Sequence, residues 1–285
     1  MVDKQLRDTI PEFGKKAGAG DGQVGVGNMS GLSSGPGART FWEIAAIVLV
    51  AVVIIGGAEV TLRLLAIPSY ILPVPSEVAV ALVTDWQFIG PHLVHTLIEL
   101  FSGYAIGASI GLLLAAVITQ FPFAEKIIAP YILVLVTTPM LALVPLLMLN
   151  FGFGYTPRII AVALASGPMV MINSATGFRR TDLAKIALAR SFGANTMQIF
   201  MKIRVPMAMP MIIVGLLIGS IFGLLTAVGA EMVGGGFGLG NRLTTFSSTI
   251  QMPQFFAVIV VLGVLGISLY VTFFLIGKKW ASWEA

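Results

Sequence analysis

Three glutamates stand inside or at the ends of long apolar stretches: Glu59, Glu99 and Glu231. An ionised side chain at bilayer depth costs about 2.5–3.5 kcal/mol on insertion scales, so each acid needs a reason to be there. Arg63 follows Glu59 by four residues, a spacing that permits an ion pair on a helix. His95 precedes Glu99 by four residues, which favours a buried hydrogen-bonded pair over a contact with a substrate. We therefore expect structural roles for the first two acids.

Glu231 differs from the other two because the glycine-rich sequence GGGFGLG follows it almost directly. Glycine lets the backbone reorient or pack closely, so an acid beside such a loop could gate a pathway or contact an external protein. Gly238 and Gly240 belong to this candidate gate. The alternative is a structural acid at the end of a helix. The G-x-G in the loop has no preceding strand, which argues against a dinucleotide site.

The other reactive residue types do not form a catalytic or metal-binding set. His92 and His95 supply two ligands without a third, and neither a Ser/His pair nor an H-E-x-x-H motif is present. The sequence contains no cysteine, which excludes disulfides and thiolate chemistry. Gly277 and the two lysines after it are only a fragment of a phosphate-binding loop. We expect a chain that is not an enzyme and that binds no cofactor itself.

The elements that position these residues are membrane spans. Hydrophobic residues make up 57% of the sequence and charged residues 11%, against about 25% charged in soluble domains. A span needs about 20 apolar residues, and six such stretches follow one another at 41–67, 93–118, 127–152, 156–176, 211–232 and 255–277. Residues 1–40 are rich in Gly and Ser and predict a disordered cytoplasmic tail. The predicted fold is an all-α integral membrane protein, with a six-span domain over 41–285.

Proline and glycine patterns predict how the spans pack. Gly90-Pro91 predicts the start of the second span. Three prolines should kink the third span and place it inside the bundle; they are Pro130, Pro139 and Pro145. A stripe of small residues in the second span predicts close helix packing; it consists of Gly103, Gly107 and Gly111. A mildly polar pathway is predicted from four side chains, Thr137, Thr138, Asn150 and Ser174.

The distribution of lysine and arginine predicts the orientation. If both termini are cytoplasmic, all but three of the 17 basic residues fall in cytoplasmic segments. The exceptions are Arg63, Arg158 and Arg242. Because cytoplasmic loops carry an excess of basic residues, this orientation is favoured over its reverse.

The segment between the fourth and fifth spans is long, basic and helical in pattern. Asp182 can cap a first helix, Gly193 breaks it, and Asn195 with Gln198 resembles the capping box of a second helix. Pro206 should stop that second helix. A helix lying on anionic lipid is one interpretation. The other is a docking surface for a cytoplasmic partner, which the glycine break favours.

The second half of this segment resembles a known motif. Gly193 is followed after nine residues by Ile203, Arg204, Val205 and Pro206. This spacing is similar to the EAA loop of permease subunits of binding-protein-dependent ABC importers. That loop has the form E-A-A, three residues, Gly, nine residues, Ile-x-Leu-Pro.

The first half matches less well. The E-A-A positions fall on Ala187, Leu188 and Ala189, so the glutamate is absent, and Arg190 follows them. The resemblance extends over about residues 70–280, through ILPVPSEV, PMLALVPLLMLNFGFG, INSATG and GAEMVGGGFGLG. This combination resembles the branch that serves nitrate, sulfonate, taurine, bicarbonate and thiamine-precursor importers. Glu99 stands where an arginine is more usual.

The resemblance implies a type I ABC importer permease fold in the inner membrane, with a coupling helix between spans four and five. That helix would sit in a cleft of a dimeric cytoplasmic ATPase, which binds ATP and Mg²⁺. An extracytoplasmic binding protein would deliver the solute, and two permease chains would form the pathway. Two other classes stay open. An ion-coupled secondary carrier would show repeated halves and midplane acids, and an intramembrane enzyme would show activity as the lone chain.

Overall fold

The structure is a computed structural model that describes residues 41–280, and the predicted tail at 1–40 lies outside this range. The chain divides into two units, Met1–Ile47 and Val48–Ala285, so the boundary falls within the first helix. Every regular element in the described range is helical. The helices are α1 (Phe41–Leu64), α2 (Pro75–Thr84), α3 (Trp86–Gln120), α4 (Pro122–Thr137), α5 (Met140–Phe151), α6 (Tyr155–Arg179), α7 (Leu183–Ser191), α8 (Thr196–Ile199), η1 (Phe200–Arg204), α9 (Val205–Gly234), α10 (Leu239–Ser248) and α11 (Met252–Trp280).

The prediction of six spans is confirmed by length and composition. Five helical stretches, those of α1, α3, α6, α8–α9 and α11, are long and apolar enough to cross a membrane. The pair α4 and α5 counts as a sixth span, bent by 96° at its break. The break lies at Thr138 and Pro139, whose backbones are extended. Proline removes a helical N–H and disfavours the α conformation of the residue before it, which explains the break. Pro130 and Pro145 lie within α4 and α5.

The second span begins earlier than the sequence predicts. Helix α3 starts at Trp86, and Pro91 lies inside the helix, not at its first position. Ile89, in the first turn, is fully buried against Leu239 and Val258 of α10 and α11. Burial of this side chain holds the turn before the proline in the helix, so tertiary packing overrides the local stop signal.

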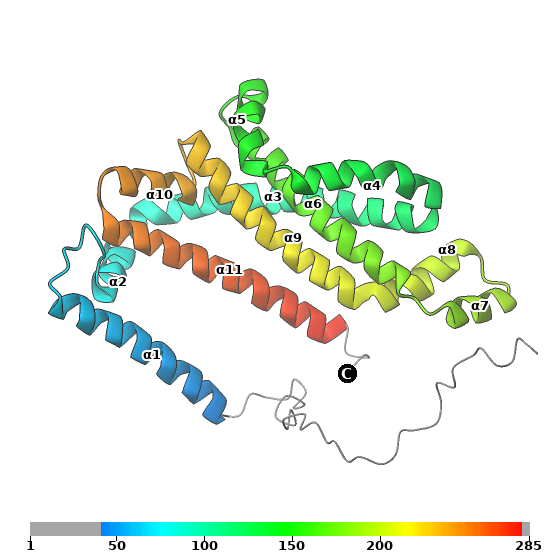
Figure 1. The fold of residues 1–285 in the computed structure, drawn as a ribbon, viewed down its shortest axis with the longest axis horizontal. Coiled ribbons are helices and arrows are strands. Elements are labelled where there is room, and N and C mark those ends of the chain that lie inside the picture. Colours follow the sequence, from blue (N-terminus) through cyan, green and yellow to red (C-terminus); the bar gives the residue numbers. More distant parts are fainter. Residues whose placement is uncertain (1–40, 281–285) are drawn as a thin grey trace, which may run out of the picture. The chain divides into compact units, whose positions relative to one another are not determined.

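Helices α3, α6 and α9 form the packed centre of the Val48–Ala285 unit (Figure 1). The glycine stripe of α3 faces α6, as predicted. A Cβ on Gly103 would lie 2.6 Å from Cβ of Val162, and those on Gly107 and Gly111 would overlap the backbone at Ala163 and Gly167. Because no side chain fits at these positions, the two helices approach as closely as their backbones allow.

Helix α9 connects the two ends of this unit. It begins beside α8 and ends beside α10, so the α7–α8 segment and the α10 loop lie at opposite ends of the same helix (Figure 1). Any movement of α9 as a rigid rod is therefore shared by both ends.

Candidate functional site

The local structure of the segment between α6 and α9 follows its capping residues. The Asp182 carboxylate accepts a hydrogen bond from the Ala184 N–H at 2.8 Å and begins α7. Gly193 ends that helix with a φ of +79°, a conformation that glycine adopts without steric cost. Asn195 and Gln198 then form both bonds of a capping box, at 2.8 and 2.9 Å. All three predictions are confirmed.

Pro206 does not stop the second helix, and that prediction is wrong. Helix α8 runs into the π-helical turn η1, and α9 follows directly, with Pro206 in its first turn. The Val205 N–H bonds to the Phe200 carbonyl, five residues back. Wider π turns usually occur as single insertions in α-helices, and this one adjusts the backbone just before a residue that cannot donate. The chain from Thr196 to Gly234 is therefore one continuous helical stretch.

The α7–α8 end carries large apolar side chains that the chain itself does not cover. We call this set the α7–α8 surface. It consists of Leu183, Leu188, Phe192, Met197 and Met201. Phe192 is 83% exposed and Met197 is 68% exposed. They stand among the basic residues Lys185 and Arg190, which marks this as a water-facing region. Exposed apolar patches of this kind mark interaction sites.

The predicted coupling residues fall into two groups. Residues at positions 187, 188, 190 and 193 are exposed, whereas Ala189 is half-buried. Ile203, Val205 and Pro206 are half-buried near the bundle. The first half of the motif is therefore mostly exposed, and the second half attaches the segment to the helix bundle.

Aromatic and aliphatic contacts fix the anchor to the bundle. Ile199 is buried, and the Phe200 ring lies 5.1 Å from that of Phe178 on α6. Arg204 donates to the Thr119 carbonyl at the end of α3, at 3.4 Å. The segment is therefore attached to α3, α6 and α9 together.

Glu231 lies at the opposite end and is fully buried. Its two oxygens accept hydrogen bonds from the Thr96 hydroxyl and the Gly240 N–H, both at 2.7 Å. Thr96 accepts in turn from the Leu239 N–H at 2.9 Å. Glu231 thus ties the start of α10 to α3, and the glycine loop folds around its carboxyl group.

Gly238 and Gly240 are required by this arrangement. Gly238 has a φ of +97°, and a Cβ there would overlap the Glu231 carboxyl group. A Cβ on Gly240 would overlap the Val228 carbonyl. The structure therefore brings three of the predicted gate residues together.

Glu99 pairs with Arg158, so the predicted partnership with His95 is wrong. The Arg158 guanidinium donates to Glu99 Oε1 at 2.9 Å, and both side chains are buried. It also donates to the carbonyls of Gly235 and Phe237, at 2.5 and 3.1 Å, and lies 4.2 Å from the centre of the Phe237 ring. His95 instead bonds to the Tyr155 hydroxyl. A partner 59 residues away cannot be recognised from local spacing.

The sequence analysis missed Arg158 as a site residue, although one signal could have found it. It lies in the first turn of a span, and a basic residue there needs a partner as much as a buried acid does. The three arginines outside the basic segments all have one. Arg63 pairs with Glu59 at 2.6 Å, as predicted, and Arg242 contacts His92 Nε2 at 2.6 Å.

The two histidines do not form a metal site with their neighbours. The described part of the chain contains no group of three or more His, Asp or Glu side chains that could hold a metal ion. His92 Nδ1 accepts from the Gly238 N–H at 3.0 Å. Like Glu231, His92 therefore accepts a hydrogen bond from a backbone N–H of the glycine-rich segment.

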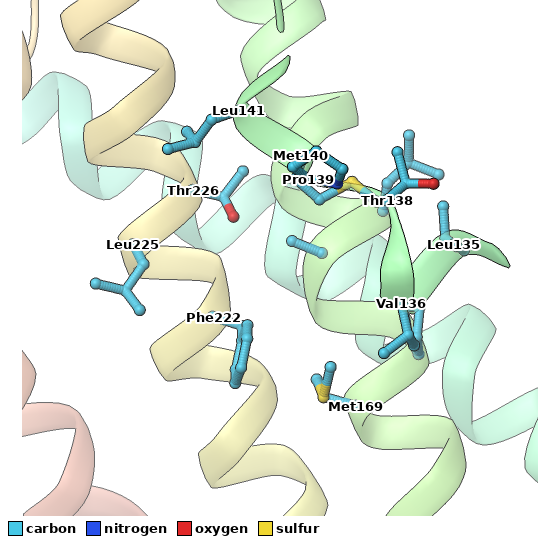
Figure 2. Close-up of a pocket in the computed structure, with 13 residues that line it drawn as sticks. Leu135, Val136, Thr138, Pro139, Met140, Leu141, Met169, Phe222, Leu225 and Thr226 are labelled. Carbon is cyan, nitrogen blue, oxygen red and sulfur yellow. The ribbon is translucent and has the colours of Figure 1, made fainter. Parts of the chain in front are cut away.

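A third region is a cavity of about 360 Å³ at the break between α4 and α5. Figure 2 shows Thr138 and Pro139 on one side of it and Phe222 and Thr226 of α9 on the other. Its lining contains no charged side chain and is mostly apolar, with the Thr138 and Thr226 hydroxyls as polar groups. The sequence analysis missed Thr226, because nothing in α9 distinguishes the helix face that meets the break.

The other predicted pathway residues do not meet at this cavity. Asn150 is exposed on α5 and donates to the Leu146 carbonyl at 2.8 Å. Thr137 donates to a carbonyl of its own helix, and Ser174 is buried in α6. None of the three is among the lining residues. Of the four predicted residues, only Thr138 lies at the cavity.

Comparison with known proteins places the chain in a transport family. Residues 107–282 match the family model described as "Binding-protein-dependent transport system inner membrane component". A riboflavin transport system permease protein of Chloroflexus aurantiacus is 28% identical, with 80% of this chain and 90% of that protein aligned. A putative aliphatic sulfonates transport permease protein of Bacillus subtilis is 27% identical, over 84% and 87% of the two chains.

A solved structure shows the same fold. A chain of an amino acid ABC transporter superposes with a TM-score of 0.60 at 20% identity, covering 70% of this chain and 97% of that one. Membership of a transport family also confirms that the chain is not itself an enzyme. The chain belongs to the family of binding-protein-dependent transport system inner membrane components, the permease components of ABC importers.

Proposed function

We propose that this permease component moves a small solute inward with energy from ATP that a separate cytoplasmic subunit hydrolyses. An extracytoplasmic binding protein delivers the solute, and the α7–α8 surface docks on the ATPase. ATP and Mg²⁺ are bound by that partner. The observation that carries the proposal is the exposed apolar α7–α8 surface, joined through η1 to α9 without a break in the helix.

The continuity of this joint supports a mechanical role. A surface on a flexible linker would move without moving the spans. Here Ile199 and Phe200 pack on α6, and Arg204 reaches α3. A displacement of α7 by the partner is therefore transmitted to the three central helices, α3, α6 and α9.

The cavity at the break between α4 and α5 supports a pathway of low affinity. Two hydroxyls and an otherwise apolar lining stabilise a small polar solute without binding it tightly. Specificity would then reside in the binding protein. The names of the relatives support solutes such as sulfonates or riboflavin, and we propose the nitrate, sulfonate, taurine, bicarbonate or thiamine-precursor class.

The proposal includes a second copy of the chain and a defined orientation. One six-span chain provides half of a pathway, so two copies would face each other. The chain would lie in the inner membrane, with both termini and the α7–α8 surface on the cytoplasmic side. The basic residues support this orientation because they gather at that end.

Cysteine cross-linking tests the docking role, since the natural sequence has no cysteine. Leu188→Cys and Met197→Cys in the assembled transporter should cross-link to a cysteine in the ATPase cleft. Tyr70→Cys is the control, because Tyr70 is also exposed but lies in the connection between α1 and α2. Capture of the ATPase by Tyr70→Cys, or by none of the three variants, would contradict the docking role.

Transport in proteoliposomes separates this mechanism from an ion-coupled carrier. Uptake should require the binding protein outside and ATP on the ATPase side, and vanadate should abolish it. Uptake driven by an ion gradient without ATP would favour the carrier instead.

A further inference from the structure

Three charged side chains are buried together at the α10 end: Glu99, Arg158 and Glu231. Among the described residues they are the only buried charged side chains. With both acids ionised, the cluster would carry two negative charges and one positive charge. A net buried charge is costly, because neither water nor a second cation compensates it. The cluster therefore lacks one positive charge.

The hydrogen bonds show where the missing charge can be supplied. Both oxygens of Glu231 accept bonds, from Thr96 and Gly240. Only Oε1 of Glu99 accepts, from Arg158, and Oε2 of Glu99 has no donor. Thr96, which donates to Glu231, precedes Glu99 by three residues on α3, so the two carboxyl groups lie on the same face of that helix. Two carboxylates cannot bond to each other unless one of them carries a proton.

We propose that this pair of glutamates binds one proton, and that the proton resides on Oε2 of Glu99 and is donated to Glu231. The proton makes Glu99 neutral and removes the excess negative charge. Glu99 Oε1 still accepts from Arg158, and Glu231 gains a further donor. Each acid then has a distinct role, one as donor and one as acceptor.

The surrounding groups do not offer another source of charge compensation. His92 is held by the Gly238 N–H and by Arg242, and Arg242 is only half-buried, so water can solvate it. His95 bonds to Tyr155 on α6. Thr96 and the backbone of the glycine loop complete the surroundings of Glu231.

The proton contributes to the attachment of the glycine loop. Arg158 binds two carbonyls of this loop, and Glu231 binds the N–H of Gly240. Loss of the proton would place two carboxylates side by side and weaken both contacts. Because the folded state binds more protons than the unfolded state, the contribution is complete at low pH and falls as the pH rises. The α10 end should therefore loosen in alkaline solution.

Infrared spectroscopy of the purified full-length chain tests for the proton. At pH 7 the wild type should show the C=O stretch of a protonated carboxyl group, displaced in D2O. Glu99→Gln should abolish this band. Glu125→Gln should leave it, because Glu125 is a half-exposed acid paired with Arg179. Absence of the band from the wild type, or its persistence in Glu99→Gln, would overturn the proposal.

Thermal unfolding shows which acid carries the proton. Glutamine is close in shape to a protonated glutamate, so Glu99→Gln should shift Tm by no more than about 1 °C, whereas Glu231→Gln, which loses an ionised acceptor, should lower Tm by about 4 °C or more. Between pH 7 and pH 9 the Tm of the wild type should fall, and that of Glu99→Gln should fall less. The reverse order of the two variants would place the proton on Glu231, and an equal fall with pH would overturn the proposal.

Discussion

The two ends of α9 differ in which side chains they bury and which they expose. At the α10 end, buried charged groups meet partners within the chain: Arg158 binds Glu99 and the glycine loop, and Glu231 binds Thr96 and Gly240. At the α7–α8 end, large apolar side chains meet water. The charged groups of the first end are bound by groups of the same chain, whereas the large apolar side chains of the second end are left exposed. A substitution at the first end should therefore affect folding, and one at the second should affect assembly.

The largest effect is expected from Arg158→Ala. Removal of one member of a set of compensating buried charges typically costs about 3–5 kcal/mol. In this variant the negative charge of Glu231 would have no buried cation. The free energy of unfolding should fall by an amount of this order, measured by denaturant titration in mixed micelles. The double variant Arg158→Ala, Glu231→Gln should recover part of the loss, because it also removes the remaining negative charge. A single variant as stable as the wild type would show that the contacts of Arg158 do not stabilise this end.

Glycines with positive φ allow a matched comparison of the two ends. Gly238→Ala should destabilise by about 1–3 kcal/mol from backbone strain, with the overlap on Glu231 in addition. Gly193→Ala should cost only about 1–2 kcal/mol, because no other atom lies within 4 Å of its Cβ position. Unfolding of both variants under the same conditions checks the order.

Transport activity, in contrast to stability, should be sensitive to Gly193. In Gly193→Val the strained turn should reorient α7 and uncouple ATP hydrolysis from transport, while the subunits still fold. Full transport by this variant would count against the docking role of the segment.

The smallest effect on stability is expected from Leu188→Asp. Leu188 is exposed, so the free energy of unfolding should change by no more than about 0.5 kcal/mol. Affinity for the ATPase should fall at least tenfold, about 1.4 kcal/mol, as measured by co-purification across a concentration series. Leu188→Met keeps the apolar contact and is the control. Unchanged affinity in Leu188→Asp would show that this side chain does not contribute to assembly.

Features that depend on neighbouring residues could be predicted from the sequence. Asp182, Gly193 and Asn195 act on backbone groups within three residues, so their pattern determines the caps and the turn. The break at Pro139 follows from the covalent structure of proline. The positions of the spans follow from their length and hydropathy.

Features that depend on distant residues could not be predicted. Glu99 has His95 at helical spacing, yet its partner is Arg158 on another helix. Thr226 faces the cavity only because α4 and α5 bend toward α9. Pro206 looks like a helix stop, and only the preceding π turn shows why the helix continues. In the first two cases tertiary packing selects one of several locally reasonable outcomes, and in the third a π turn in the preceding residues does so.

The π turn at Phe200–Arg204 also determines the direction in which the α7–α8 surface faces about the axis of α9. An α-helix rotates by about 100° for each residue, and a π turn contains one residue more than a regular turn. Deletion of one residue there would swing Phe192 and Met197 about the axis of α9 by roughly that angle, without altering either side chain. The backbone of these five residues thus sets the direction in which the α7–α8 surface faces.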